Sequence, residues 1–117
     1  MRSRSQIDHF IPWARHVHNA IENLVFAHDT CNNAKSAFLA AEDHVERWLA
    51  RMRDRDSLTS LASVAQHTHW EHRPPATQAI GAATYLMLPE SYKLSAFANE
   101  FTPINLRRLQ VAFAAAA

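Results

Sequence analysis

Ile7-Asp8-His9-Phe10-Ile11-Pro12 and, further on, Leu24-Val25-Phe26 are the stretches that decide the fold of this chain. Both are rich in β-branched and aromatic residues, so each is predicted to form a short strand, the first over residues 6–12. Pro12 has no backbone N–H to offer a neighbouring strand, so the first strand should end there. Residues 13–22 have no regular apolar period and are predicted to form a loop. The chain therefore begins as strand, loop and strand.

An apolar stripe follows the second strand. Asp29 and Thr30 are good helix N-caps, and apolar residues recur at steps of three and four from residue 31 to residue 52. The pattern predicts either one long helix or two helices that break near Ala41. Acidic residues precede basic ones from Glu42 onward, an order that suits the dipole of a helix starting there.

The second half is predicted to be helical with loops. The expected helices cover residues 57–66, 76–88 and 103–117. Residues 67–75 should be a loop, whereas residues 91–101 fit a loop or a strand. Thr102 followed by Pro103 has the pattern of an N-cap with proline at the first helical position. The predicted fold class is therefore α+β and mostly helical, with a small unit over residues 1–55 and a helical extension over residues 56–117.

The composition of the 117 residues excludes several classes of protein. Gly81 is the one glycine, which argues against an all-β fold and against glycine-rich nucleotide-binding loops. Twelve basic and eleven acidic residues give a net charge of +1, so bulk charge does not predict nucleic-acid binding. The arginines of residues 47–55 alternate with acids and should form a solvated helix face. No apolar run has the length of a membrane span or a signal peptide, so we expect a cytoplasmic protein without membrane contact.

Three short motifs carry the chemistry of this sequence. Asp8-His9 ends the first predicted strand, Asn23 precedes the second, and Cys31-Asn32-x-x-Lys35 opens the predicted helix. In this order and spacing they resemble the signature of the HNH endonucleases, which are ββα-metal nucleases. The resemblance covers residues 6 to about 41 and implies a metal-dependent hydrolase that cuts DNA phosphodiester bonds.

The resemblance implies a role for each motif residue. His9 would be the general base, since an imidazole can take a proton near neutral pH. Asp8 and Asn32 would bind a divalent metal ion; a carboxylate and an amide oxygen suit a hard cation such as Mg²⁺, with Mn²⁺ as a substitute. Asn23 would tie down the loop and orient the ring of His9, and Lys35 could contact a DNA phosphate.

The sequence also departs from the family pattern. Asn32 stands where many relatives have histidine, and Cys31 has no partner cysteine, so no structural zinc is expected within this chain. Almost nothing precedes the signature, as in a relative that has been cut off just upstream. A double-strand cut by so small a site would favour a homodimer.

Two hypotheses for the function follow. The first is an active HNH-type endonuclease. The alternative is a truncated, inactive relative that serves as a nucleic-acid-binding or protein-interaction module. Metal-dependent nicking of plasmid DNA that is lost in EDTA separates the two.

The remaining histidines and tryptophans have less specific interpretations. His67, His69 and His72 are expected on an exposed loop, and His16 and His18 are expected to face solvent. The alternating positions of His67 and His69 could also suggest a metal cluster, but the loop offers little else that would fix an ion. The tryptophans are interpreted as packing residues.

Overall fold

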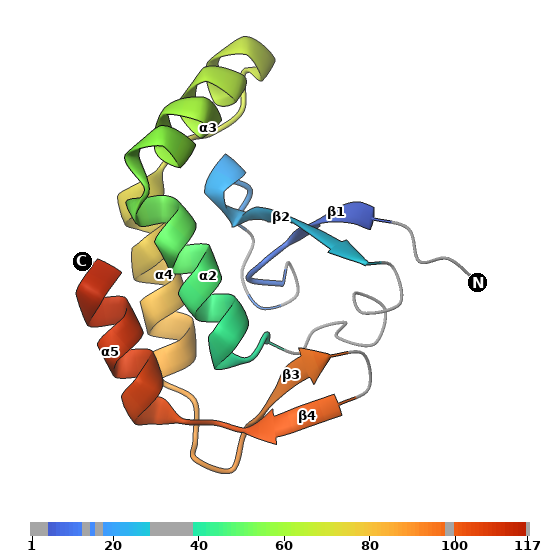
Figure 1. Ribbon diagram of the computed structural model, residues 1–117, viewed down its shortest axis with the longest axis vertical. Helices are drawn as coiled ribbons and strands as arrows, with labels where there is room; N and C mark the ends of the chain where they lie inside the picture. Colours follow the sequence, from blue (N-terminus) through green and yellow to red (C-terminus); the bar gives the residue numbers. More distant parts are fainter. Residues whose placement is uncertain (1–4, 13–14, 16–17, 29–38, 98–99, 117) are drawn as a thin grey trace.

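The computed structural model describes residues 5–12, 15, 18–28, 39–97 and 100–116. Within these residues the fold is α+β and mostly helical, as the sequence predicted. The elements are β1 (Ser5–His9), the 3₁₀ turn η1 (Ile21–Asn23), β2 (Leu24–His28), α2 (Glu42–Arg53), α3 (Arg55–Thr68), α4 (Pro74–Leu86), β3 (Lys93–Phe97), β4 (Glu100–Pro103) and α5 (Leu106–Ala116). Helices α2, α4 and α5 lie side by side, and the β1–β2 hairpin stands against this layer (Figure 1).

Strands β1 and β2 pair antiparallel, with His9 opposite Leu24 at the end where the connecting loop begins and ends. β1 ends at His9, although the sequence predicted a strand to Pro12. The difference has a local cause, because the side-chain amide of Asn23 takes both backbone polar groups of Ile11. Phe10 and Ile11 then turn into the core, where both are buried.

Helix α2 begins at Glu42, so the stripe of apolar residues breaks near Ala41. The break is stabilised by strand-like pairing, in which Ala41 N–H donates to the Ser95 carbonyl and Ser95 N–H donates to the Leu39 carbonyl, at 2.9 and 2.8 Å. These residues cannot satisfy the same backbone groups in a helix. The predicted start of the first helix, from Asp29 to residue 38, lies outside the described residues.

Helix α4 buries three residues at four-residue spacing, Thr77, Gly81 and Tyr85. The spacing puts them on one face of the helix, toward α2 and the hairpin. A Cβ atom at position 81 would lie 2.9 Å from Trp48 Cζ3 and 3.1 Å from Phe113 Cε1. Glycine is therefore required here by the close approach of two aromatic rings to the helix.

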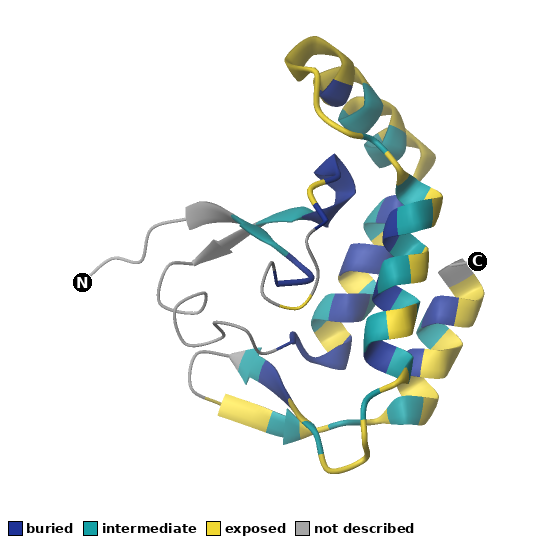
Figure 2. Ribbon diagram, turned by 180° about the vertical axis from the view of Figure 1, so that it is seen from behind, coloured by how far each residue is buried: buried dark blue, intermediate teal, exposed yellow. Residues whose placement is uncertain are grey.

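The core is continuous between the hairpin and the helical layer. Phe10 stacks on Trp48 with 4.4 Å between ring centroids, and Tyr85 lies between Phe10 and Phe113 at 6.4 and 6.0 Å. Buried residues gather where the helices face the hairpin, whereas most of α3 is exposed (Figure 2). Ala65 is the one residue of α3 that is buried.

The second half of the chain differs from prediction at several boundaries. Within the ambiguous residues 91–101, Lys93–Phe97 form β3, which pairs antiparallel with β4 from Glu100 onward. The predicted N-cap Thr102 with Pro103 at the first helical position is wrong, since Pro103 is the last residue of β4. The side chain of Asn105 caps α5 instead, accepting from Arg108 N–H at 3.0 Å. In the described part of the chain, no helix is long and apolar enough to cross a membrane.

Candidate active site

His9 is the last residue of β1 and is half-buried. Its Nε2 lies 2.8 Å from the side-chain oxygen of Asn19. An amide oxygen only accepts, so Nε2 carries the hydrogen in this contact. The neutral ring then has its basic lone pair on Nδ1. Asn19 therefore selects the tautomer of His9, a role that the sequence motif did not indicate.

Asp8 lies one residue before His9 in β1, opposite Val25 of β2, and is also half-buried. Successive strand residues point to opposite faces, so its carboxylate leaves β1 on the other side from the His9 ring. The other predicted ligand, Asn32, lies outside the described residues, as do Lys35 and Cys31. The described residues contain no group of three or more His, Cys, Asp or Glu side chains that could hold a metal ion. Asp8 is therefore the described part of the predicted metal site.

Asn23 is fully buried and fastens the loop between the strands. Its side-chain oxygen accepts from Ile11 N–H at 2.8 Å, and its side-chain nitrogen donates to the carbonyls of Ile11 and His18 at 3.2 and 3.0 Å. Its backbone carbonyl accepts from Phe10 N–H at 2.6 Å. Asn23 thus bonds residues on both sides of the loop, and Asn19 contacts the His9 ring.

Glu22, next to Asn23, is fully buried and joins the loop to the helices. Its carboxylate accepts from His72 Nδ1 at 2.6 Å, from Arg73 N–H at 2.9 and 3.2 Å, and from Thr77 Oγ1 at 2.9 Å. Its backbone carbonyl accepts from Trp48 Nε1 at 2.8 Å and from Arg51 Nη2 at 2.6 Å. A buried carboxylate is tolerated only with such a set of donors.

The sequence offered one weak signal for Glu22, namely a carboxylate inside the apolar run from Ala20 to Val25. A charged residue there must either point outward or find buried partners. Its partners His72 and Thr77 lie 50 and 55 residues away, and no local pattern connects them. The role of Glu22 was therefore visible only in three dimensions.

Two expectations about the histidines are wrong. His18 does not face solvent but is 6% exposed, and its Nε2 lies 2.7 Å from Thr77 Oγ1. His67 is not on an extended loop but in α3, where Nδ1 bonds the Ser63 carbonyl at 2.8 Å. Helix α3 extends to Thr68 and ends on His69, whose φ of 56° is left-handed.

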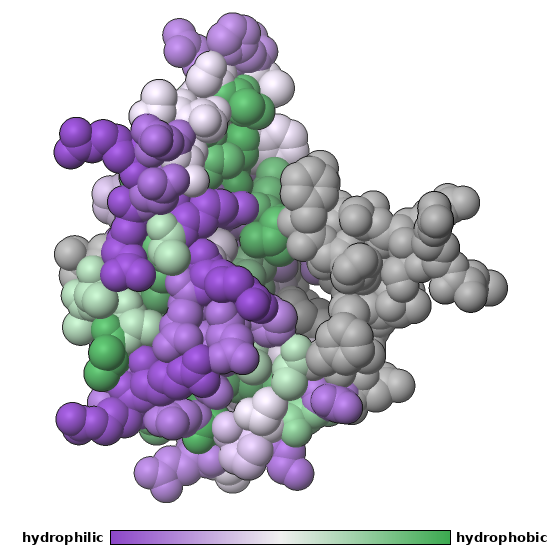
Figure 3. Space-filling model, viewed as in Figure 1, coloured by the Kyte–Doolittle hydropathy of each residue, from purple (hydrophilic) through white to green (hydrophobic). Residues whose placement is uncertain are grey.

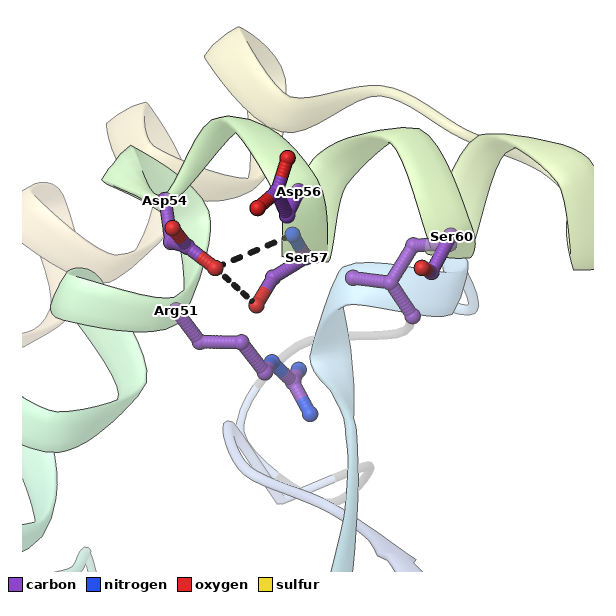
Figure 4. Close-up of a pocket in the computed structure, with 6 residues that line it drawn as sticks. Arg51, Asp54, Asp56, Ser57 and Ser60 are labelled. Atoms are coloured by element: carbon purple, nitrogen blue, oxygen red, sulfur yellow. Dashed lines mark hydrogen bonds between the residues drawn. The ribbon is translucent and has the colours of Figure 1, made fainter.

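A cleft of about 350 Å³ opens where α2 meets α3 (Figure 4). It is lined by Arg51, Asp54, Asp56, Ser57, Ser60 and Leu61. Two of its charged groups have structural partners: Asp54 accepts from Ser57 N–H and Oγ as the cap of α3, and Arg51 extends toward Glu22. The cleft contains neither Asp8 nor His9 and does not belong to the candidate site.

The sequence suggested that all arginines of α2 lie on a solvated face, and this prediction is wrong for one of them. Arg47 and Arg53 are exposed, but Arg51 is half-buried against Glu22, and burial lowers its pKa. Hydrophilic side chains cover the front of α2, and the surface over α5 is mixed (Figure 3). There Arg108 of α5 bonds to Asp43 and to Glu46. Hydrogen bonds from Arg108 lower the pKa of both carboxyl groups.

Residues 1–41 match the family profile described as HNH endonuclease. The matched segment contains the Asp8-His9, Asn23 and Asn32 positions, and it ends just before α2. The resemblance predicted from the motifs is therefore confirmed over this segment. Neither the curated proteins nor the solved structures contain a match to the chain.

Proposed function

We propose that this chain is a metal-dependent endonuclease that hydrolyses DNA phosphodiester bonds, with His9 as its general base. The observation that carries the proposal is the half-exposed imidazole at the end of β1, inside the segment that matches the HNH endonucleases. A general base must be positioned and must present its lone pair to the water that it activates. The contact with Asn19 supports the first requirement, because it holds the His9 ring in one orientation.

In the proposed reaction, Nδ1 of His9 takes the proton from the attacking water. Asn19 accepts from Nε2–H both before and after this transfer, so it holds the ring in the same orientation throughout. Asn23 keeps the backbone at Phe10 and Ile11 fixed, directly after the base. When a neighbour fixes the orientation of the base, its ring rotates away from the attacking water less often, and the reaction is faster.

The proposed metal ligands are Asp8 and Asn32, a donor set of one carboxylate and one amide oxygen. Oxygen donors of this kind fit Mg²⁺, with Mn²⁺ as a substitute, better than zinc. When bound, the cation would polarise the phosphate and stabilise the leaving oxygen. Lys35 is proposed to contact a phosphate of the DNA.

The proposal is tested by nicking of supercoiled plasmid DNA by the purified protein. We expect nicking with Mg²⁺ or Mn²⁺ and none with EDTA. Replacing the base (His9→Ala) should lower the rate about 10²–10⁴-fold. The matched control is His67→Ala, which removes the same side chain from an exposed position on α3 and should cleave like the parent.

Two results would contradict the proposal. Cleavage by His9→Ala at the parent rate would remove His9 from the reaction. A parent protein that binds DNA without cleaving it under any of the metal conditions would support the inactive, binding relative instead.

A further inference from the structure

The linker between α3 and α4, residues 69–73, runs along the loop that precedes β2. Trp70 Nε1 donates to the Asn19 carbonyl at 2.5 Å, and Ile21 N–H donates to the Glu71 carbonyl at 2.7 Å. The Arg73 N–H then donates to the Glu22 carboxylate. With the His72 contact to the same carboxylate, four successive residues of this short segment hold the loop against the helical extension.

Thr77, in the first turns of α4, continues this set of contacts in the interior. Its side chain is fully buried. The hydroxyl donates to Glu22 Oε1 at 2.9 Å, so its oxygen is the acceptor for His18 Nε2 at 2.7 Å. One hydroxyl thus joins two loop residues, and its removal leaves two buried polar groups each short of one partner.

The loop residues held by the extension are the same ones that hold the active site. Asn19 bonds the linker through its backbone and the His9 ring through its side chain. The His18 carbonyl accepts from the side chain of Asn23, which in turn fixes Ile11. The contacts therefore form one continuous path from α4 to the base.

We infer that the α3–α4 linker and Thr77 position the active site, by fixing the loop that orients His9. The inference rests on the proposed nuclease function and gives the helical extension a part in it. The hydrogen bonds described above from residues 70–77 go to loop residues rather than to the proposed base, so these residues act as positioning residues. A small displacement of a base can cost a large factor in rate even when binding is unchanged.

The test compares four variants of the full chain. Thr77→Val removes the hydroxyl and keeps the β-branched shape, and Thr77→Ser restores the hydroxyl. Thr84→Val is the matched control, because Thr84 is in the same helix and its hydroxyl bonds only the Ile80 carbonyl of that helix. Trp70→Phe removes the bond to Asn19 from a ring that is 40% exposed, so the variant should fold.

Two measurements are made on each variant: kcat and KM of Mg²⁺-dependent plasmid nicking, and hydrogen exchange at the amides of Ile11 and Asn23. Thr77→Val should lower kcat about tenfold with KM unchanged, and should speed exchange at both amides. Trp70→Phe should lower kcat about threefold, as expected for one lost hydrogen bond. Thr77→Ser should recover most of the loss, and Thr84→Val should behave like the parent.

The outcomes separate this inference from the proposed function. If the parent cleaves and both Thr77→Val and Trp70→Phe keep its kcat, the inference is wrong and the nuclease function stands. If kcat falls without faster exchange at Ile11 and Asn23, the effect does not pass through the loop and the inference is also wrong. If the parent does not cleave, the proposed function fails. Hydrogen exchange alone then tests whether the linker holds the loop. Faster exchange in Thr77→Val but not in Thr84→Val then supports the linker as the holder of the loop, and equal exchange overturns it.

Discussion

The β1–β2 hairpin and the layer of α2, α4 and α5 are stabilised by different kinds of contact. The helices share buried apolar and aromatic side chains, among them Trp48, Tyr85, Leu109 and Phe113. The hairpin and its loop contribute Phe10 and Ile11 to that core, with Val25 packed against it, and polar contacts through Glu22 and Asn23 also fix them.

The comparison shows how a small polar site can be held in place. A two-stranded hairpin is marginally stable by itself in water. Here it gains order from the helices through one aromatic stack and one buried carboxylate. The candidate catalytic residues are on the hairpin, and most of the core that supports them belongs to the helical layer.

The largest expected effect comes from cutting the aromatic link between the two regions. Phe10→Ala should lower the free energy of unfolding by about 3–5 kcal/mol, because it leaves a cavity against Trp48. Phe113→Ala is the matched control in the same aromatic cluster and should cost a similar amount. Chemical denaturation measures both, and nicking is measured where each variant is still folded. The comparison predicts that Phe10→Ala loses more activity than Phe113→Ala, and equal losses would contradict it.

Gly81→Ala tests the packing within the helical layer. Helix propensity alone would stabilise the variant by about 1 kcal/mol. The new Cβ would lie 2.9 Å from a buried tryptophan ring, so overpacking should outweigh propensity and leave a net loss of about 1–2 kcal/mol. Ala83→Gly, at an exposed position on α4, should lose about 1 kcal/mol through propensity alone. A Gly81→Ala protein that melts above the parent would show that the rings can move aside.

Tyr85→Phe tests the point where α4 meets the chain before α2. The lost hydroxyl donates to the Ala40 carbonyl at 2.8 Å, and leaving that carbonyl unpaired should cost about 1 kcal/mol. Burial also raises the pKa of Tyr85 well above its ordinary value. The unfolded chain loses this proton near pH 10 while the folded chain keeps it, so the parent loses stability as pH rises past about 10. Denaturation of the two proteins at pH 8 and pH 11 should show their difference shrinking at the higher pH.

The smallest effect is expected at the surface contact between α2 and α5. Arg108→Gln removes the partner of Asp43 and Glu46, whose pKa values Arg108 lowers. Lowered carboxyl pKa values stabilise the fold above the unfolded pKa of about 4, and this contribution is lost as pH falls through the lowered values. The parent should therefore melt slightly above the variant at pH 7, with the gap closing in acid and in high salt. A gap that persists below pH 2 would point to packing of the Arg108 side chain instead.

Local patterns predicted the elements of both regions and some of their boundaries. Strand-forming residues around Ile7 and Leu24, and the three- and four-residue spacing of α2, are signals that lie within one element. The helix start at Thr102 was wrong because Pro103 also fits the end of a strand, and the structure caps α5 with Asn105. Such a choice depends on the pairing of β4 with β3, which the local sequence does not encode.

The candidate site was predictable only in its motif residues. Asp8, His9 and Asn23 follow a known pattern, and Asn23 bonds Ile11 and His18 in the loop. Asn19, Glu22, His18 and Thr77 were missed because their roles come from contacts between distant segments. An ordinary threonine in a helix carries no sign of a buried carboxylate 55 residues earlier.

The face of α4 that carries Thr77, Gly81 and Tyr85 also fixes the position of α4 along the axis of α2. Each of the three meets a different neighbour: the Glu22 carboxylate, the Trp48 ring and the Ala40 carbonyl. A slide of α4 by one turn, about 5.4 Å, would bring a threonine or a tyrosine under the Trp48 ring, where only glycine fits. The lone glycine of the chain thus fixes the position of α4 along its axis. The aromatic contact at this glycine therefore also determines where Thr77, one turn away, meets the loop.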